Sequence, residues 1–468
     1  MKKILLLSPP YVKDYMRNAR CDFVSLSHSN WYPLWLGFAG ALLEKNGYEV
    51  KLIDAPVYNL SHDETYEQIK SFAPDTIVVY LGRLSEDNDI AFAERLHDGL
   101  CKDIVFVGPY FSMDPKNTLS KTKYNFLGIQ KEFEYPLLEY LNGDDYKNIK
   151  NFLYKQDDTV AANELRPYLK TEELDNIPFV SEFFYRHLDV RKYKVPSELY
   201  PYIDTMSGRG CAYGKCSFCL WVNTFIEGCR YNMRSINNII DELEYIARNM
   251  KGVRAVMIQD DMLASKRARD IAEGILKRDI KIKWSCYMKP DKNVPYETFR
   301  AMKMSGCLNM HVGFESGDDE ILRAVSKGNT VEDALIFSEK VHRAGLRIHG
   351  DFAIGFPGET KQTAQKTINL AKTINPYSAQ FQIMIPFKGT PMYDYLKAKG
   401  WLDDNEMPSY PELSSTEIER TAKRAYMQFY FRFEYMLKIL LHPFDYFFSR
   451  LDTFKAALPA LFWKKWVR

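Results

Sequence analysis

The sequence predicts an α/β protein with two βα series: an N-terminal Rossmann-like domain, then a partial (β/α)6 barrel of the TIM type, then a helical C-terminal tail. Two observations predict this. Short apolar runs alternate with helical patterns in both series, as in parallel βαβ units. The 468 residues are also too many for one compact core. We expect domain boundaries at 1–140, 141–200 (a polar, proline-containing linker), 201–390 and 391–468.

The first series has expected strands at the five apolar runs 4–7, 50–53, 76–81, 104–107 and 125–129. A helical pattern over 35–45 ends at Asn46-Gly47. Parallel sheets of this kind bind ligands at the carboxyl ends of their strands. No G-x-G-x-x-G follows the first run, which disfavours a dinucleotide site.

The second series has expected strands at 202–206, 255–259, 283–287, 309–314, 347–354 and 379–385. Helical patterns lie between them, for example at 236–248 and 265–277. Six βα units make a partial barrel, in which chemistry is expected where the strands end.

Composition excludes some classes of function and fixes an expected location. The net charge of +2 gives no argument for nucleic-acid binding. The sequence has no run of 18 apolar residues, so no transmembrane helix is expected. The start, MKKILLLSPPY, is interpreted as a buried strand and not as a signal peptide. Eight cysteines, five of them scattered, do not resemble a disulfide framework. We expect a cytoplasmic protein.

Three cysteines are clustered as Cys211-x4-Cys216-x2-Cys219, just after the first expected barrel strand. Three thiolates on a 4Fe–4S cluster would leave one iron open for an external ligand. The competing interpretation is a zinc site completed by Cys229, and a third is three buried cysteines on a loop. Spacing alone leaves these open.

The segment RGCAYGKCSFC resembles the cluster loop of radical S-adenosylmethionine (SAM) enzymes, whose usual pattern is C-x3-C-x2-C. This sequence has one extra residue between the first two cysteines. The resemblance implies that SAM binds the open iron and is cleaved reductively to a 5′-deoxyadenosyl radical. It also implies an external electron donor such as flavodoxin or ferredoxin.

Further segments resemble SAM-contacting motifs of that family at the expected strand ends. Gln259 and Asp260 match the position that meets the SAM amino group, although Asp260 also suits a helix N-cap. Glu315 and Ser316 match the ESG motif. Asp351 and Gly355 lie in GDFAIGFPGE, which departs from the family pattern at Asp351 and Ala353. The resemblance gives Phe218 and Lys327 roles beside the adenine and the SAM carboxylate.

The N-terminal series resembles the domain of cobalamin-binding radical SAM enzymes. The resemblance implies cobalamin contacts from two strand ends and one helix, at Pro9, Pro10, Trp35, Gly108, Pro109 and Tyr110. The D-x-H-x-x-G signature is missing, so no histidine from that motif is expected on the cobalt. The alternative is a domain that no longer binds the corrin.

Segments such as 188–196 and 218–221 resemble hopanoid-associated radical SAM proteins, which act on a polycyclic lipid. Lys289 stands where arginine is expected. Residues 421–468 hold fourteen aromatic residues, nine Lys or Arg and three acids, a composition that suits a membrane interface. The alternative is an ordinary helix that covers the barrel.

We therefore expect a cobalamin-dependent radical SAM enzyme that modifies an unactivated carbon of a small-molecule or lipid-linked substrate, most simply by methyl transfer. One alternative is ring contraction of a sugar on a hopanoid side chain. Another, of a different class, is a zinc-stabilised binding protein. No catalytic base is assigned, although Tyr287, His311 and His349 lie on or near expected strands.

Overall fold

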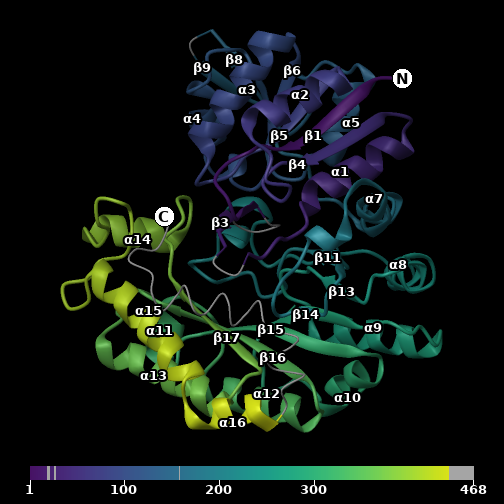
Figure 1. Ribbon diagram of the computed structural model, residues 1–468. Helices are drawn as coiled ribbons and strands as arrows, with labels where there is room; N and C mark the ends of the chain where they lie inside the picture. The colour runs from purple at the N-terminus through teal and green to yellow at the C-terminus, as the bar shows by residue number, and fades with distance from the viewer. Residues whose placement is uncertain (18–21, 26–27, 158, 442–468) are drawn as a thin grey trace.

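A computed structural model describes residues 1–17, 22–25, 28–157 and 159–441. Figure 1 shows two α/β bodies, with the first sheet at the top of the view and the second at the bottom. The chain crosses between them through residues 163–201, which carry α6 (Thr171–Asn176), α7 (Val180–His187) and the short turn η2 (Val190–Lys192).

The first sheet has seven strands in the order β4-β1-β5-β6-β7-β8-β9. Its strands are β1 (Lys3–Ser8), β4 (Glu49–Asp54), β5 (Thr76–Tyr80), β6 (Asp103–Val107), β7 (Leu127–Ile129), β8 (Phe152–Gln156) and β9 (Thr159–Ala162). All pairs from β4 to β7 are parallel, as the sequence predicts. Alternate residues of β1 enter two different cores, Ile4 and Leu6 on one face, Leu5 and Leu7 on the other. Helices therefore cover both faces.

The helices of this domain are α1 (Leu34–Lys45), α2 (His62–Phe72), α3 (Glu86–Leu100), α4 (Pro115–Ser120) and α5 (Glu134–Asn142), with the turn η1 (Phe111–Met113). A small hairpin of β2 (Tyr15–Arg17) and β3 (Asp22–Val24) follows β1. The hairpin is held by its buried Arg17, which pairs with Asp89 at 2.7 Å. This places β2 and β3 over the carboxyl edge of the sheet.

The expected linker 141–200 is wrong for residues 152–162. Strands β8 and β9 form an antiparallel extension of the first sheet, with β8 paired to β7. Phe152 and Leu153 are buried in its two cores, which makes this hairpin part of the domain. The first domain thus extends about twenty residues beyond its expected end at 140.

The second sheet is the expected partial barrel. Its six strands run in sequence order and all pairs are parallel: β10 (Tyr202–Thr205), β13 (Ala255–Ile258), β14 (Trp284–Met288), β15 (Cys307–Glu315), β16 (Arg347–Ile354) and β17 (Ser378–Ile383). The helices between them are α8 (Ile236–Asn249), α9 (Ser265–Lys277), α10 (Tyr296–Met304), α11 (Asp319–Ala324), α12 (Val331–Arg343) and α13 (Lys361–Ile374). The loop after β10 carries β11 (Gly208–Arg209), η3 (Trp221–Phe225) and β12 (Asn232–Met233).

The C-terminal region is helical up to its last described residues, as expected. After α14 (Pro391–Lys399), α15 (Ser415–Tyr430) covers β17, where Tyr430 donates to the carbonyl of Ala379 at 2.7 Å, and α16 (Phe433–Leu441) follows. Within the described residues, no helix is long and apolar enough to cross a membrane. The rest of the aromatic, basic segment, 442–468, lies outside the described residues.

Candidate active site

The three clustered cysteines lie on the loop between β11 and η3, at the carboxyl end of β10. The extra residue of the C-x4-C spacing is absorbed at Gly214, whose φ of 56° is in the left-handed region. A Cβ there would lie 2.2 Å from the carbonyl oxygen of Gly228, so only glycine fits. The Gly214 N–H points back to Cys211 Sγ at 3.4 Å. The loop therefore closes on itself despite its unusual length.

The spacing of the thiols separates the two metal interpretations. In tetrahedral zinc sites with Zn–S bonds of about 2.3 Å, the sulfurs lie about 4 Å apart. Among the described residues, which include Cys211, Cys216, Cys219 and Cys229, no three cysteines have sulfurs all within 4.8 Å of one another. Cys229 is exposed, and its thiol donates to the carbonyl of Tyr213 at 2.8 Å. Among the described residues, the cysteines therefore do not form a preformed zinc site.

Two lysines bring positive charge to the cysteine loop. Lys327 is buried, pairs with Glu315 at 2.8 Å, and lies 5.9 Å from the ring centre of Phe218. Lys289, which stands where arginine was expected, donates to the carbonyl of Gly328 at 2.7 Å and lies over Tyr213 at 4.7 Å. The structure thus brings together Lys327, Glu315 and Phe218, which the sequence predicted separately.

Electrostatics around the thiols match a site that binds a cationic centre. Burial raises the pKa of all three thiols, that of Cys219 to about 12, while Lys327 acts against this at Cys216. Burial opposes the charge of Lys327, yet Glu315 and Cys216 together raise its pKa. A metal centre that takes up the thiolate charge removes the main cost of ionising these cysteines.

Asp260 has a different place from the expected contact with SAM. It is fully buried and accepts hydrogen bonds from the Ser207 and Gly208 amides, at 2.6 and 3.1 Å, and from the Tyr231 hydroxyl. The neighbouring Asp261 accepts from the Gly210 amide at 2.9 Å. These carboxylates fix the backbone just before Cys211. Gln259, which is 2 % exposed, directly follows β13 and precedes these two carboxylates.

The remaining predicted SAM residues divide between two places. Gly355 (φ 108°) begins a turn whose amide donates to the buried Glu359 at 2.6 Å, and Phe356 of this turn contacts Phe218 at 5.1 Å between ring centres. Ser316 is buried and shares a hydrogen bond with Thr367 at 3.3 Å.

Asp351 is not part of that turn. It lies in the barrel beside His349, with 3.5 Å between Oδ1 and Nε2.

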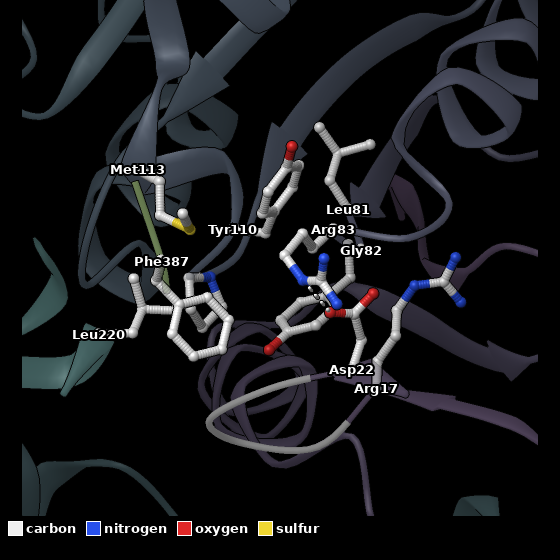
Figure 2. Close-up of a pocket in the computed structure, with 11 residues that line it drawn as sticks. Arg17, Asp22, Leu81, Gly82, Arg83, Tyr110, Met113, Leu220 and Phe387 are labelled. Atoms are coloured by element: carbon white, nitrogen blue, oxygen red, sulfur yellow. Dashed lines mark ion pairs between the residues drawn. The ribbon is translucent and has the colours of Figure 1, made fainter. Parts of the chain in front are cut away.

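A pocket lies between the first domain and the cysteine loop (Figure 2). Its wall from the first domain includes Gly82, Pro109 and Tyr110, at the carboxyl ends of β5 and β6. The barrel supplies Leu220 and Phe387. Because Leu220 directly follows Cys219, the pocket and the cysteine loop share a wall.

The other residues predicted to contact cobalamin do not line this pocket. Gly108 has a φ of 115° and turns the chain at the end of β6. The carbonyls of Pro9 and Pro10 accept hydrogen bonds from Arg17 and Asn88, at 2.9 and 2.8 Å.

Trp35, which was also predicted to contact cobalamin, does not line the pocket. It is fully buried against Trp221 and Phe225, with ring centres 5.5 and 5.0 Å away.

A joint between the domains was missed from sequence. Arg209, two residues before Cys211, is 2 % exposed and pairs with Glu132 and Glu134 of the first domain, each at 2.7 Å. Its guanidinium also lies 4.7 Å from the ring centre of Trp35. Only the position of Arg209 inside RGC could have signalled it, since the two glutamates are remote in sequence.

Comparison with known proteins identifies the barrel. Residues 205–371 match the radical SAM superfamily. The chain therefore carries a radical SAM domain, and the prediction of a radical SAM enzyme is confirmed.

Relatives extend the likeness over the whole chain. An uncharacterised methyltransferase of Pyrococcus horikoshii is 27 % identical over 96 % of both chains. Cytidylyl-2-hydroxyethylphosphonate methyltransferase of Streptomyces wedmorensis is 24 % identical over 86 % of this chain and 83 % of its own.

Two solved structures share the fold. The radical SAM methyltransferase TsrM from Kitasatospora setae, with cobalamin and a [4Fe-4S] cluster bound, has a TM-score of 0.66 at 17 % identity and covers 90 % of this chain and 85 % of its own. The cobalamin-dependent radical enzyme OxsB, with aqua-cobalamin and S-adenosylmethionine bound, has a TM-score of 0.71 at 16 % identity and covers 99 % and 72 %. The two-domain fold class is thereby confirmed.

Proposed function

We propose that this protein is a cobalamin-dependent radical SAM methyltransferase that acts on an unactivated carbon of a small molecule. The observation that carries the proposal is the shared wall: Leu220 follows Cys219 and lines the pocket at the carboxyl edge of the first sheet. A cluster on the cysteines and a corrin in the pocket would thus be neighbours. Bound together, the cluster, SAM and cobalamin would supply the substrate radical and the methyl group.

The residues beside the cysteines fit SAM. SAM offers an ammonium and a carboxylate at one end and an adenine at the other. The buried Glu315–Lys327 pair provides one charge for each of the first two groups. Phe218 and Phe356 form an apolar surface for the adenine, and the turn at Gly355 brings backbone close to it. These residues orient SAM and keep water away, while Asp260 and Asp261 hold the loop that carries the cysteines.

The pocket fits part of a corrin that carries polar amide side chains. Arg17 and Arg83 line it, and the Nε of each is buried without a hydrogen-bond partner among the described residues. Arg83 lies 3.9 Å from Asp22, too far for a hydrogen bond. Buried N–H groups without a protein partner suit the acceptor groups of a ligand. Gly108, Pro109 and Tyr110 would approach its edge, as proposed from sequence.

Substrate identity is the finer part of the proposal. Methyl transfer is favoured over ring contraction of a hopanoid sugar because two relatives that match 96 and 86 % of this chain are named methyltransferases. A lipid-linked substrate is supported by the surface of α16, where Phe433, Leu440 and Leu441 are 77, 74 and 65 % exposed. We propose that this helix contacts a membrane surface peripherally.

Anaerobic reconstitution tests the proposal. The intact protein is supplied with iron, sulfide, hydroxocobalamin, SAM and reduced flavodoxin. We expect a full cluster, a retained corrin spectrum, and formation of 5′-deoxyadenosine. With the right substrate, mass spectrometry should show an added methyl group, whereas ring contraction would add none.

Three results would contradict parts of the proposal. A full cluster without SAM cleavage would overturn the radical function. Cleavage without corrin retention would overturn the cobalamin part alone. For the membrane contact, the Phe433→Asp/Leu440→Asp variant should lose sedimentation with anionic vesicles, and unchanged sedimentation, or none by either protein, would overturn it.

A further inference from the structure

A second polar cluster lies inside the barrel, and it includes Asp351, one of the residues predicted to contact SAM. It consists of His311 on β15 and His349 and Asp351 on β16. The strand register pairs His311 with His349 and Gly313 with Asp351, so alternate residues share one face. One nitrogen of each imidazole and one carboxylate oxygen lie within 4.8 Å of one another. Among the described residues, no other group of three His, Cys, Asp or Glu is this close.

Each imidazole is oriented through one nitrogen by a partner outside the cluster. His311 Nε2 lies 2.8 Å from the carboxylate of Glu198, which also accepts from the Ser285 hydroxyl. His349 Nδ1 lies 2.6 Å from the hydroxyl of Ser378. This leaves His311 Nδ1 and His349 Nε2 toward the cluster, and it is His349 Nε2 that lies 3.5 Å from Asp351. Metal-binding histidines are held in the same way, by a carboxylate or hydroxyl on the other nitrogen.

Burial makes the cluster a built site that a small ion can still reach. The side chains of His311 and Glu198 are 4 and 2 % exposed, while those of His349 and Asp351 are 15 and 23 % exposed. The site therefore has a buried floor and a partly open side.

We propose that His311, His349 and Asp351 bind a divalent transition-metal ion of the Zn²⁺ type, separate from the iron–sulfur cluster. Two imidazoles and a carboxylate are the ligands that such ions prefer. Three protein ligands leave one position open in a tetrahedral site.

The open position gives the ion a role. Asp351 is in register with Gly313, and a Cβ on Gly313 would meet the Glu315 carboxylate at 2.5 Å and Lys327 at 3.1 Å. His311 precedes Glu315 by four residues, roughly 13 Å of strand. An oxygen of the substrate bound to the ion would lie within one small-molecule length of the SAM site. This role rests on the proposed function, whereas metal binding does not.

Zinc uptake by the anaerobic holoenzyme, with its iron and sulfide complete, tests the site. Full occupancy of the cysteines by the cluster removes them as zinc ligands. After addition of Zn²⁺ and dialysis against a competing chelator, elemental analysis should find one zinc per chain. The His349→Gln and Asp351→Asn variants should bind zinc about 100-fold more weakly. The matched control is His342→Gln, because His342 bonds to the carbonyl of Ile374 on the outer helices and should leave uptake unchanged.

Absence of zinc from the wild-type holoenzyme, or equal uptake by both variants and wild type, would overturn the proposal. Zinc-edge X-ray absorption of the wild-type protein keeps the test decisive if the variants fail to fold. Two imidazole ligands and no sulfur support the site, and sulfur ligands overturn it. SAM cleavage, measured in parallel, reports on the proposed function separately.

Discussion

The cysteine loop and the pocket of the first domain are neighbours, yet they are built in opposite ways. At the loop, reactive and charged side chains define the site: Cys211, Cys216, Cys219 and the Glu315–Lys327 pair. At the pocket, the strand ends at Gly82 and Pro109 and apolar walls such as Leu220 shape the space, and Arg17 and Arg83 add charge at its lining. A site of the first kind fails when its chemistry is removed. A site of the second kind fails when its shape changes.

The largest expected effect comes from the cysteines. Replacing any of Cys211, Cys216 or Cys219 with alanine should lower SAM cleavage by at least about a thousandfold, because the cofactor carries the difficult step. Corrin retention should stay at the wild-type level. Cys229→Ala is the control and should keep both properties. If a cysteine variant lost corrin and cleavage together, the two sites would not be separable.

The second largest effect is expected at the joint between the two regions, where Arg209 pairs with Glu132 and Glu134. Arg209→Ala leaves Glu132 and Glu134 buried without their partner, which should cost about 3–5 kcal/mol of the free energy of unfolding. Both SAM cleavage and corrin retention should fall, because the joint holds the cysteine loop against the domain that carries the pocket. Arg166→Ala breaks partly exposed pairs and should cost less than about 1 kcal/mol. Equal urea midpoints for the two variants would contradict the assignment.

The Gly214→Ala variant tests whether the backbone shape of the cysteine loop also matters. Its Cβ would meet the Gly228 carbonyl, a backbone atom that no rotamer change can move, at a cost of about 3 kcal/mol. We expect a large loss of iron per chain after reconstitution. Gly143→Ala, also at a positive φ of 106° but with open space around it, controls for backbone strain alone. Full iron in the Gly214 variant would show that the loop is not fixed there.

The turn at Gly355 makes a prediction about pH. Burial raises the pKa of Glu359 to about 7, while its hydrogen bonds with the Gly355 and Phe356 amides act in the opposite direction. Between its usual pKa and about 7, the folded protein holds a proton that the unfolded chain has released. Stability is thus lost as the pH rises through this window, by about 3 kcal/mol.

Glu359→Gln removes this titration and still offers an acceptor to the turn. From about pH 5 to about pH 8, its urea midpoint should fall less than that of the wild type. Parallel curves for the two proteins would contradict the assigned pKa.

The smallest expected effect belongs to the pocket. Gly82→Ala places a Cβ 2.0 Å from the Tyr15 hydroxyl and 2.6 Å from Ser85 Oγ, so the wall of the pocket must shift. Affinity for hydroxocobalamin, measured by spectroscopic titration, should fall about tenfold, or about 1.4 kcal/mol. SAM cleavage should not change. Gly47→Ala, with open space around it, is the control.

The sequence was informative where chemistry sits in short motifs and periodic apolar runs. The resemblance of short motifs to radical SAM enzymes gave Lys327, Glu315 and Phe218 separate roles beside SAM, and the structure brings the three together. Long-range partners were not predictable, and Arg209 finds Glu132 in another domain. Asp260 fitted a SAM contact by position, but its oxygens hold the backbone amides of Ser207 and Gly208.

Two other differences between the expectation from sequence and the structure have local causes. The hairpin at 152–162 was missed because its strands are short and polar at their ends, although FLYKQ followed by a turn and TVAA carried a signal. Trp35 was assigned to cobalamin because its segment resembles that of cobalamin-binding radical SAM enzymes. In the structure its large ring packs between the domains, against Trp221 and Phe225.

The pairing of Arg209 with Glu132 and Glu134 also has a consequence for biosynthesis. A chain emerges from the ribosome from its N-terminus, and its domains generally fold in that order. Both glutamates are therefore made and positioned before the arginine that they receive, and before the three cysteines that follow it. The folded first domain therefore offers ion-pair partners to Arg209 when the cysteine loop is synthesised, so the loop is anchored before iron is inserted.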